Sequence, residues 1–227
     1  MPFSEKSVSF LFENRVVDNK AWFTEHRSDY DSLVIEPMRE LVTSLEPTMH
    51  EIDPLLICEP KVGRSISRIY RDTRFSRDKS IFRDSMWCVF IRDKKLYDGL
   101  PGFWFEFSPR GLIYGCGYYQ ASGASMDAIR TLILNDDKSF KAAQKAFNKQ
   151  SVFQIEDLKF KRSRHPDEPE DKREWLDQKS LCFITYSDDF DLLFSDTLAD
   201  KLAQDFKLLA PMYDFMMSAE ARVIKRL

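Results

Sequence analysis

The chain of 227 residues is 43% hydrophobic and 31% charged and carries a formal net charge of −3, a composition typical of a folded globular protein and not of a disordered one. It contains no run approaching the roughly 18–20 apolar residues that cross a bilayer, and its first residues lack the basic and apolar regions of a signal peptide. We therefore expect a soluble, cytoplasmic protein with no membrane partner.

The cysteines and histidines show no pattern of a metal or redox centre. The cysteines form no C-x-x-C pair, which excludes a zinc ribbon or a thioredoxin-type motif. The three histidines form none of the short zinc-binding patterns. We therefore predict no metal site and no cofactor. In a reducing compartment the cysteines should be buried free thiols, at Cys58, Cys88, Cys116 and Cys182.

The first 50 residues predict helices. Apolar residues fall at helical spacing over 8–17, and Asp18-Asn19 then supplies a polar cap for the next helix. A second apolar stripe runs from Trp22 through residue 45, and Pro37 is expected to bend this helix near its middle. His26 lies on the same stripe, where a half-buried histidine with a local hydrogen bond is favoured over a catalytic one.

The middle of the chain predicts strands of a largely antiparallel sheet, because a continuous apolar run is followed by alternating patterns. Turn residues at 93–99 and 108–111 separate these strands. Gly115 and Gly117 mark either a bulge, which we favour, or a place where another element or a ligand comes close. The predicted strands are residues 86–91, 103–107 and 112–119.

The last hundred residues predict helices again. One is expected to start at Ser122 and another after the acidic residues that end at Asp137, and residues 181–186 have strand character. The acidic stretch 187–191 lacks the glycine and distal glutamate of a calcium loop, so it predicts a helix cap. The final helix should be interrupted at Pro211.

Together these elements predict an α+β fold. No repeat or linker divides the chain, so we expect a single domain over residues 1–227, with a largely antiparallel sheet packed against N-terminal, central and C-terminal helices.

One segment combines most of the chemistry. Between residues 68 and 84 the chain has six Lys or Arg and three Asp, a local excess of positive charge in an acidic protein. Three arginines within seven residues indicate a cradle for phosphate or carboxylate oxygens. Phe75 is expected to anchor the loop in the core. The candidate ligand-binding residues are Arg68, Arg71, Asp72, Arg74, Lys79 and Arg83.

The residues leave three functions open. The favoured one is the binding, or also the turnover, of a phosphorylated or carboxylated small molecule, with Asp72 as the orienting group or proton acceptor. The second is a nucleic-acid or protein interaction module, in which residues 159–164 extend the basic segment into an exposed stripe with aromatic neighbours; the sequence pI near 5.7 argues against non-specific duplex binding. The third is a cluster of structural ion pairs, which also fits alternating Arg and Asp.

The basic segment also carries a resemblance to a known family. The pattern Arg68-x-x-Arg71-Asp72-x-Arg74-Phe75-x-x-x-Lys79, with an aromatic pattern around Trp22 upstream and Gly115-x-Gly117 downstream, resembles the uncharacterised bacterial and fungal family DUF2461 over nearly the whole chain. The resemblance implies no activity, substrate or cofactor. After Lys79 the chain has Ser-Ile-Phe where the family pattern implies a tyrosine, so no phenol is expected there.

Overall fold

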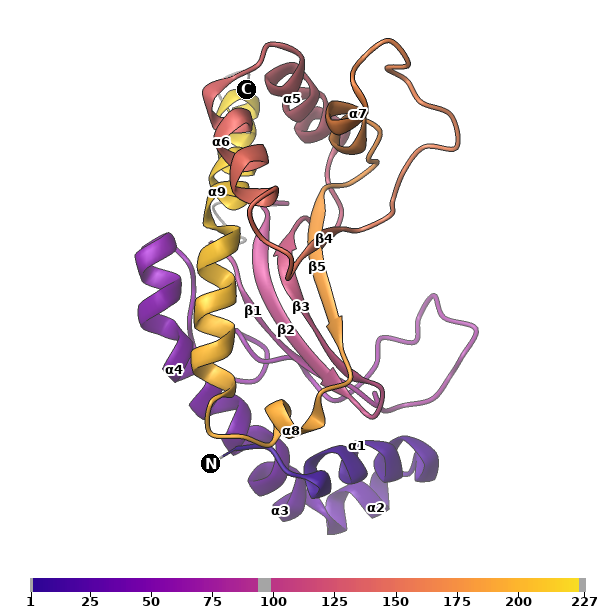
Figure 1. Cartoon of the computed structure of the whole chain (residues 1–227). Helices are drawn as coiled ribbons and strands as arrows, with labels where there is room; N and C mark the ends of the chain where they lie inside the picture. Colours follow the sequence, from indigo (N-terminus) through magenta and orange to yellow (C-terminus); the bar gives the residue numbers. More distant parts are fainter. Residues whose placement is uncertain (1, 94–98, 225–227) are drawn as a thin grey trace. The chain divides into compact units, whose positions relative to one another are not determined.

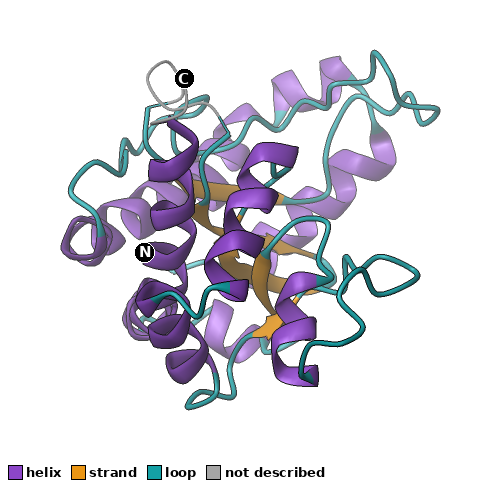
Figure 2. Ribbon diagram, turned by 90° about the horizontal axis from the view of Figure 1, so that it is seen from above, coloured by secondary structure: helices purple, strands orange, loops and turns teal. Residues whose placement is uncertain are grey.

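The computed structural model describes residues 2–93 and 99–224. Helices and strands are joined by long loops (Figure 2), and the predicted α+β class with an antiparallel sheet is confirmed. The chain forms two compact units, each built from three segments. Unit 1 consists of Met1–Phe90, Trp104–Tyr114 and Tyr186–Ala203, and unit 2 consists of Ile91–Phe103, Gly115–Thr185 and Gln204–Leu227.

Unit 1 begins with helices that the apolar pattern predicted as two. Asn19 Oδ1 accepts hydrogen bonds from the backbone N–H groups of Ala21 (2.7 Å) and Trp22 (3.2 Å), so the expected cap is confirmed. The long second helix is divided, however. A π-helical turn precedes Pro37, which occupies the first turn of the next helix, where a missing N–H is tolerated. The elements are α1 (Glu5–Val17), α2 (Lys20–Glu25), α3 (Arg27–Tyr30), η1 (Asp31–Ile35) and α4 (Glu36–Ile52).

His26 lies at the junction of α2 and α3. Its Nδ1 donates a hydrogen bond to the backbone oxygen of Trp22 at 2.8 Å, and the two rings stack with centroids 4.1 Å apart. The predicted half-buried histidine with a local hydrogen bond is confirmed.

The strands form one five-stranded sheet in the hydrogen-bonded order β1-β2-β3-β5-β4 (Figure 1). At one edge β4 pairs antiparallel with β5, with Gln154 opposite Ile184. The predicted turn at 93–99 lies, over residues 94–98, outside the described part of the chain. The strands are β1 (Met86–Phe90), β2 (Gly102–Ser108), β3 (Gly111–Gly117), β4 (Gln154–Ile155) and β5 (Cys182–Ser187).

Two glycines allow β3 to lie close to β5. Gly111 has φ 120°, and a Cβ added there would lie 2.3 Å from the backbone oxygen of Ser187. A Cβ on Gly117 would lie 2.6 Å from Cα of Cys182. Both positions require glycine because the obstacle is backbone. At Gly117 the structure therefore shows the close approach that the sequence left open beside a bulge.

The remaining helices begin where the sequence predicts caps. Ser122 Oγ accepts from Ser125 N at 3.0 Å, and Asp137 Oδ1 accepts from Ser139 N at 2.9 Å. In the acidic stretch, Asp189 Oδ1 accepts from Leu192 N at 2.8 Å, which confirms a cap there. These helices are α5 (Gly123–Leu134), α6 (Lys138–Phe147), α7 (Glu170–Leu176), which no pattern predicted, α8 (Phe190–Leu193) and α9 (Leu198–Ile224).

The predicted interruption at Pro211 is wrong, because α9 is continuous through it. Proline in a helix removes a hydrogen bond and costs about 3 kcal/mol. The same helix carries a stripe of fully buried side chains that offsets this cost, formed by Leu202, Phe206, Leu209, Met212, Tyr213 and Met216.

Aromatic side chains dominate the core of each unit. In unit 2 the buried Trp175 ring has four aromatic neighbours at centroid distances between 5.2 and 5.9 Å, namely Phe140, Phe147, Phe183 and Phe215. All four cysteines are buried free thiols, as expected. Among the described residues, no helix has the length and apolar character to cross a membrane.

Candidate functional site

The basic segment forms an open loop in unit 1, which we call the basic loop (residues 71–81) (Figure 1). The loop is closed at its base by two backbone hydrogen bonds, from Arg71 N to Ile81 O (2.8 Å) and from Arg83 N to Ile69 O (2.9 Å). Just before the loop, Ile66 and Tyr70 form isolated β-bridges, Ile66 with Cys88 and Tyr70 with Phe82.

The C-terminus of α1 also contacts the base of the basic loop. Asp18 has a left-handed backbone (φ 46°) at the C-terminus of α1, and its Oδ1 accepts the N–H groups of Ile81 (2.7 Å) and Phe82 (3.1 Å). One carboxylate oxygen therefore joins the first helix to the returning arm of the basic loop.

Asp78 joins the loop to the body of unit 1. Its carboxylate accepts from Arg71 Nη1 at 2.5 Å and from Arg15 Nη2 at 2.6 Å. The hydroxyl and backbone N–H of Ser80 donate to the other oxygen, and together with the two arginines these bonds hold the pKa of the Asp78 carboxyl well below its usual range. Arg71 is therefore already committed to an acid.

Asp72 and Arg74 form a second pair, at the surface. Arg74 Nε and Nη2 donate to the two carboxylate oxygens of Asp72 at 3.0 and 2.7 Å, a bidentate geometry. The hydrogen bonds from Arg74 lower the pKa of Asp72 to about 2. An acid with that pKa is a poor proton acceptor near neutral pH, so Asp72 is better suited to orienting Arg74 than to catalysis.

Lys79 and Arg83 contact backbone oxygens within the same segment. Lys79 Nζ donates to the oxygen of Thr73 at 2.9 Å, and Arg83 Nε donates to the oxygen of Tyr70 at 3.3 Å. The Arg83 guanidinium also lies 4.5 Å from the centre of the Trp87 ring.

Two arginines of the basic segment have no acidic partner among the described residues. Arg68 and Arg77 are exposed and form no ion pair within the described ranges 2–93 and 99–224. The guanidinium of Arg68 lies against Gly63, where its Nε is 3.3 Å from the position that a Cβ would occupy. Arg77 was not among the predicted site residues.

The expectation that Phe75 anchors the loop in the core is wrong. Its side chain is 96% exposed, and the Arg74 guanidinium lies 5.8 Å from the centre of its ring. The core side of the segment is supplied instead by Phe82, which is fully buried against Phe23 with centroids 5.0 Å apart. Phe75 and Phe82 both stand among mostly polar residues in the sequence, so the sequence alone does not tell which of the two rings is buried.

Sequence reasoning also missed Arg15, Asp18 and Asp78 as parts of this structure. Asp78 lay inside the basic segment, but nothing in the pattern linked it to a helix 63 residues earlier. A charged side chain near the end of a helix can remain in water or pair with any of several acids. Its partner is therefore decided by the tertiary fold.

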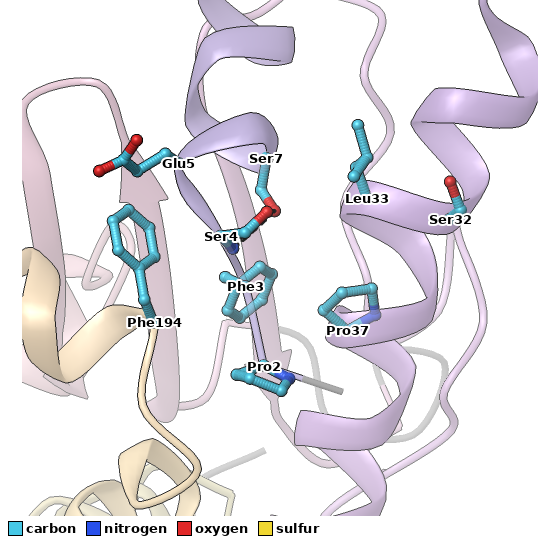
Figure 3. Close-up of a pocket in the computed structure, with 9 residues that line it drawn as sticks. All are labelled: Pro2, Phe3, Ser4, Glu5, Ser7, Ser32, Leu33, Pro37 and Phe194. Carbon is cyan, nitrogen blue, oxygen red and sulfur yellow. Dashed lines mark hydrogen bonds between the residues drawn. The ribbon is translucent and has the colours of Figure 1, made fainter.

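A cavity of about 540 Å³ lies elsewhere in unit 1 (Figure 3). Phe3 lies between Phe194 on one side and Leu33 with Pro37 on the other, and no lining residue belongs to the basic loop. The candidate anion site is therefore a surface loop and does not share this cavity.

The second basic run, residues 159–164, belongs to unit 2, whereas the basic loop belongs to unit 1. The predicted common stripe of the two runs stays a prediction.

Comparison with known proteins adds one finding. A family model described as a conserved hypothetical protein (DUF2461) matches residues 6–215. No curated protein and no solved structure matches the chain.

Proposed function

The chain belongs to the DUF2461 family, and we propose that it binds a phosphorylated or carboxylated ligand at the surface of the basic segment, residues 68–84. The observation that carries this proposal is the presence of two exposed guanidinium groups, those of Arg68 and Arg77, without an acidic partner in the part of the chain that the structure describes. Guanidinium is permanently charged and offers a planar set of donors that fits these oxyanions.

The Asp72–Arg74 pair supports the same proposal. A carboxylate already occupies the fork of Arg74, which supports the proposal that a ligand carboxylate or phosphate binds there in its place. Because both side chains are solvated, the ligand can replace Asp72 without leaving a buried charge unpaired.

Phe75 indicates the kind of ligand. A nearly fully exposed ring next to Arg74 offers an apolar face beside cationic donors. This combination favours a ligand that carries a ring next to its anionic group, such as a nucleotide or an aromatic acid.

Thermal denaturation with added anions tests the proposal. The probes are inorganic phosphate, pyrophosphate, AMP and benzoate. A ligand at about 100 times its Kd adds roughly 2.7 kcal/mol, which raises the Tm of a chain of this size by about 5–10 °C. We expect AMP to be the best probe, and we expect the Arg68→Gln/Arg77→Gln variant to lose the shift.

The matched control is Arg27→Gln/Arg39→Gln, which removes the same charge from α3 and α4. Arg27 pairs with Asp31 at the start of η1, and Arg39 pairs with Glu36 on α4. This control should keep the shift. A wild-type protein that no probe stabilises, or a control that loses as much as the loop variant, would exclude the proposal.

A structural role is the second candidate, and it applies to Arg71. The shared contact of Arg71 and Arg15 with Asp78 favours it. Arg71→Gln should lower Tm slightly while leaving the anion-induced shift in place. Equal loss of the shift in the Arg71 and Arg68/Arg77 variants would assign Arg71 to the ligand instead.

The four buried thiols support a reducing compartment for this activity, and we propose the cytoplasm.

A further inference from the structure

A second basic surface lies in unit 2, on the loop that precedes α7. Its backbone is fixed by a short antiparallel pairing, in which Phe160 N donates to Asp177 O and Lys179 N donates to Leu158 O, both at 2.9 Å. Lys159 lies opposite Gln178 in the same pairing. The backbone at Phe160 is therefore held by this pairing, which we call the frame, and is not part of a free loop.

Two largely buried side chains reinforce this frame. Arg130, on α5, donates from Nε to Leu176 O (3.1 Å) and from Nη2 to Gln178 O (2.8 Å). The buried carboxylate of Asp177 accepts the backbone N–H of Arg164 at 3.0 Å. Bonds of this kind hold the two arms of the loop in one geometry before any partner arrives.

The Phe160 ring serves as a support for cations. The guanidinium carbon of Arg164 lies 3.7 Å from the ring centre, and Lys179 Nζ lies 5.9 Å from it. A guanidinium at that distance stacks on the ring. Because the Arg164 side chain is exposed, its N–H groups and outer face stay accessible to solvent.

Cationic side chains are concentrated beside Phe160, in the sequence and at its ring. Four of them lie within residues 159–164, and a fifth, Lys179, has its Nζ 5.9 Å from the ring centre. All five are exposed, and none forms an ion pair with any residue in 2–93 or 99–224. Two acids of the run that follows in sequence have partners outside this group: Glu168 faces Lys172, and Asp171 accepts from Gln144. The five cations are Lys159, Lys161, Arg162, Arg164 and Lys179.

From this arrangement we propose that the Phe160 surface binds single-stranded nucleic acid. Cations placed in series along an open loop match the repeated phosphates of a polymer. An exposed guanidinium plane backed by an aromatic ring is a platform on which an unpaired base stacks. The bases of a duplex are not available for such stacking. The inference goes beyond the proposed function and does not depend on it, because the residues belong to the other unit.

Fluorescence anisotropy with labelled oligo(dT) and oligo(rU) of about 20 nucleotides, and with a duplex of equal length, tests the proposal. We expect binding of the single strands that weakens between about 50 and 200 mM salt. Lys161→Gln/Arg162→Gln/Arg164→Gln should weaken binding at least about tenfold and reduce the salt slope by about 2, at about 0.7 for each phosphate that the variant no longer neutralises. Phe160→Leu, which keeps every charge, should weaken it about fivefold.

The control variant Lys141→Gln/Lys145→Gln/Lys149→Gln removes the same charge from exposed positions on and just after α6, and it should bind as the wild type does. Far-UV circular dichroism confirms that each variant is folded. The proposal is overturned if the wild type binds no oligonucleotide, if the control loses as much affinity, or if the duplex binds as tightly as the single strands. Preferential binding of anionic vesicles or of a phosphopeptide would overturn it as well.

Discussion

Arg15 on α1 and Asp78 in the basic loop, 63 positions apart in sequence, meet through a hydrogen bond of 2.6 Å between Nη2 and Oδ2. Because Arg71 donates to the same oxygen, a single carboxylate fastens the loop both to its own base and to the first helix. The loop can therefore present its outer cations in a limited set of positions, which reduces the entropy lost when a ligand binds.

Loss of the Asp78 ion pairs should increase the mobility of the basic loop more than it lowers the stability of the whole protein. We expect Asp78→Asn to increase hydrogen exchange at the backbone amides of 72–80, since two guanidinium groups lose their charged acceptor. The change in Tm should be small because the carboxylate is partly solvated. Hydrogen exchange followed by mass spectrometry measures the effect. Exchange that is unchanged at 72–80 would show that the loop is held by its backbone bonds alone.

The Asp72–Arg74 pair predicts a particular dependence on pH. The folded-state pKa of Asp72, about 2, lies below the ordinary value of about 3.9. The stability that the pair contributes is therefore present above about pH 4 and is lost as pH falls through about 2. Carboxyl-carbon NMR should show Asp72 titrating near pH 2 in the wild type. In Arg74→Gln, and in the wild type at high salt, the midpoint should move toward the ordinary value; an unchanged midpoint contradicts the pairing.

Gly111 should be among the least replaceable residues of the sheet. Alanine at φ 120° is strained, and its Cβ would meet the Ser187 oxygen at 2.3 Å. We expect Gly111→Ala to cost about 2–4 kcal/mol of unfolding free energy, measured in urea. Gly123→Ala is the control, because nothing lies within 4 Å of its added Cβ and it sits in a helix. It should be neutral or slightly stabilising.

Tyr118 and Tyr119 are neighbours with opposite environments. The Tyr118 hydroxyl donates to Glu220 Oε1 at 2.7 Å, and both side chains are buried, whereas Tyr119 is 97% exposed. Tyr118→Phe leaves a buried carboxylate oxygen without this donor and should cost about 1–3 kcal/mol. Tyr119→Phe should leave the urea midpoint unchanged. Similar midpoints for the two variants would mean that Glu220 finds another donor at little cost.

Phe75 and Phe82 test which ring of the basic segment belongs to the core. Phe82 is fully buried and Phe75 is 96% exposed. Phe82→Ala should destabilise the protein by about 3–5 kcal/mol through the cavity it leaves, while Phe75→Ala should leave Tm within error and weaken only the binding of ring-containing anions. Thermal melts of the two variants decide this. A large fall in Tm for Phe75→Ala would place its ring in the core after all.

Much of the local structure could be predicted because its causes are local. Asn19, Ser122 and Asp189 cap helices through bonds to backbone groups two or three residues away, and His26 bonds to the oxygen one turn earlier. Apolar runs and alternating patterns likewise identified four strands, β1, β2, β3 and β5, and helical spacing identified the outer helices. The candidate anion site is a different case, since it was identified from residue types, and its function stays a prediction.

The sequence by itself determined the α+β class, the caps and the concentration of arginines between residues 68 and 83, because these depend on short-range periodicity, backbone donors and composition. Only the tertiary structure decided that Arg15 pairs with Asp78, that Phe82 and not Phe75 is buried, and that α9 continues through Pro211. Each of those outcomes depends on which distant surfaces pack together. Along α9, burial of the apolar stripe outweighs the cost of about 3 kcal/mol that proline imposes on a helix.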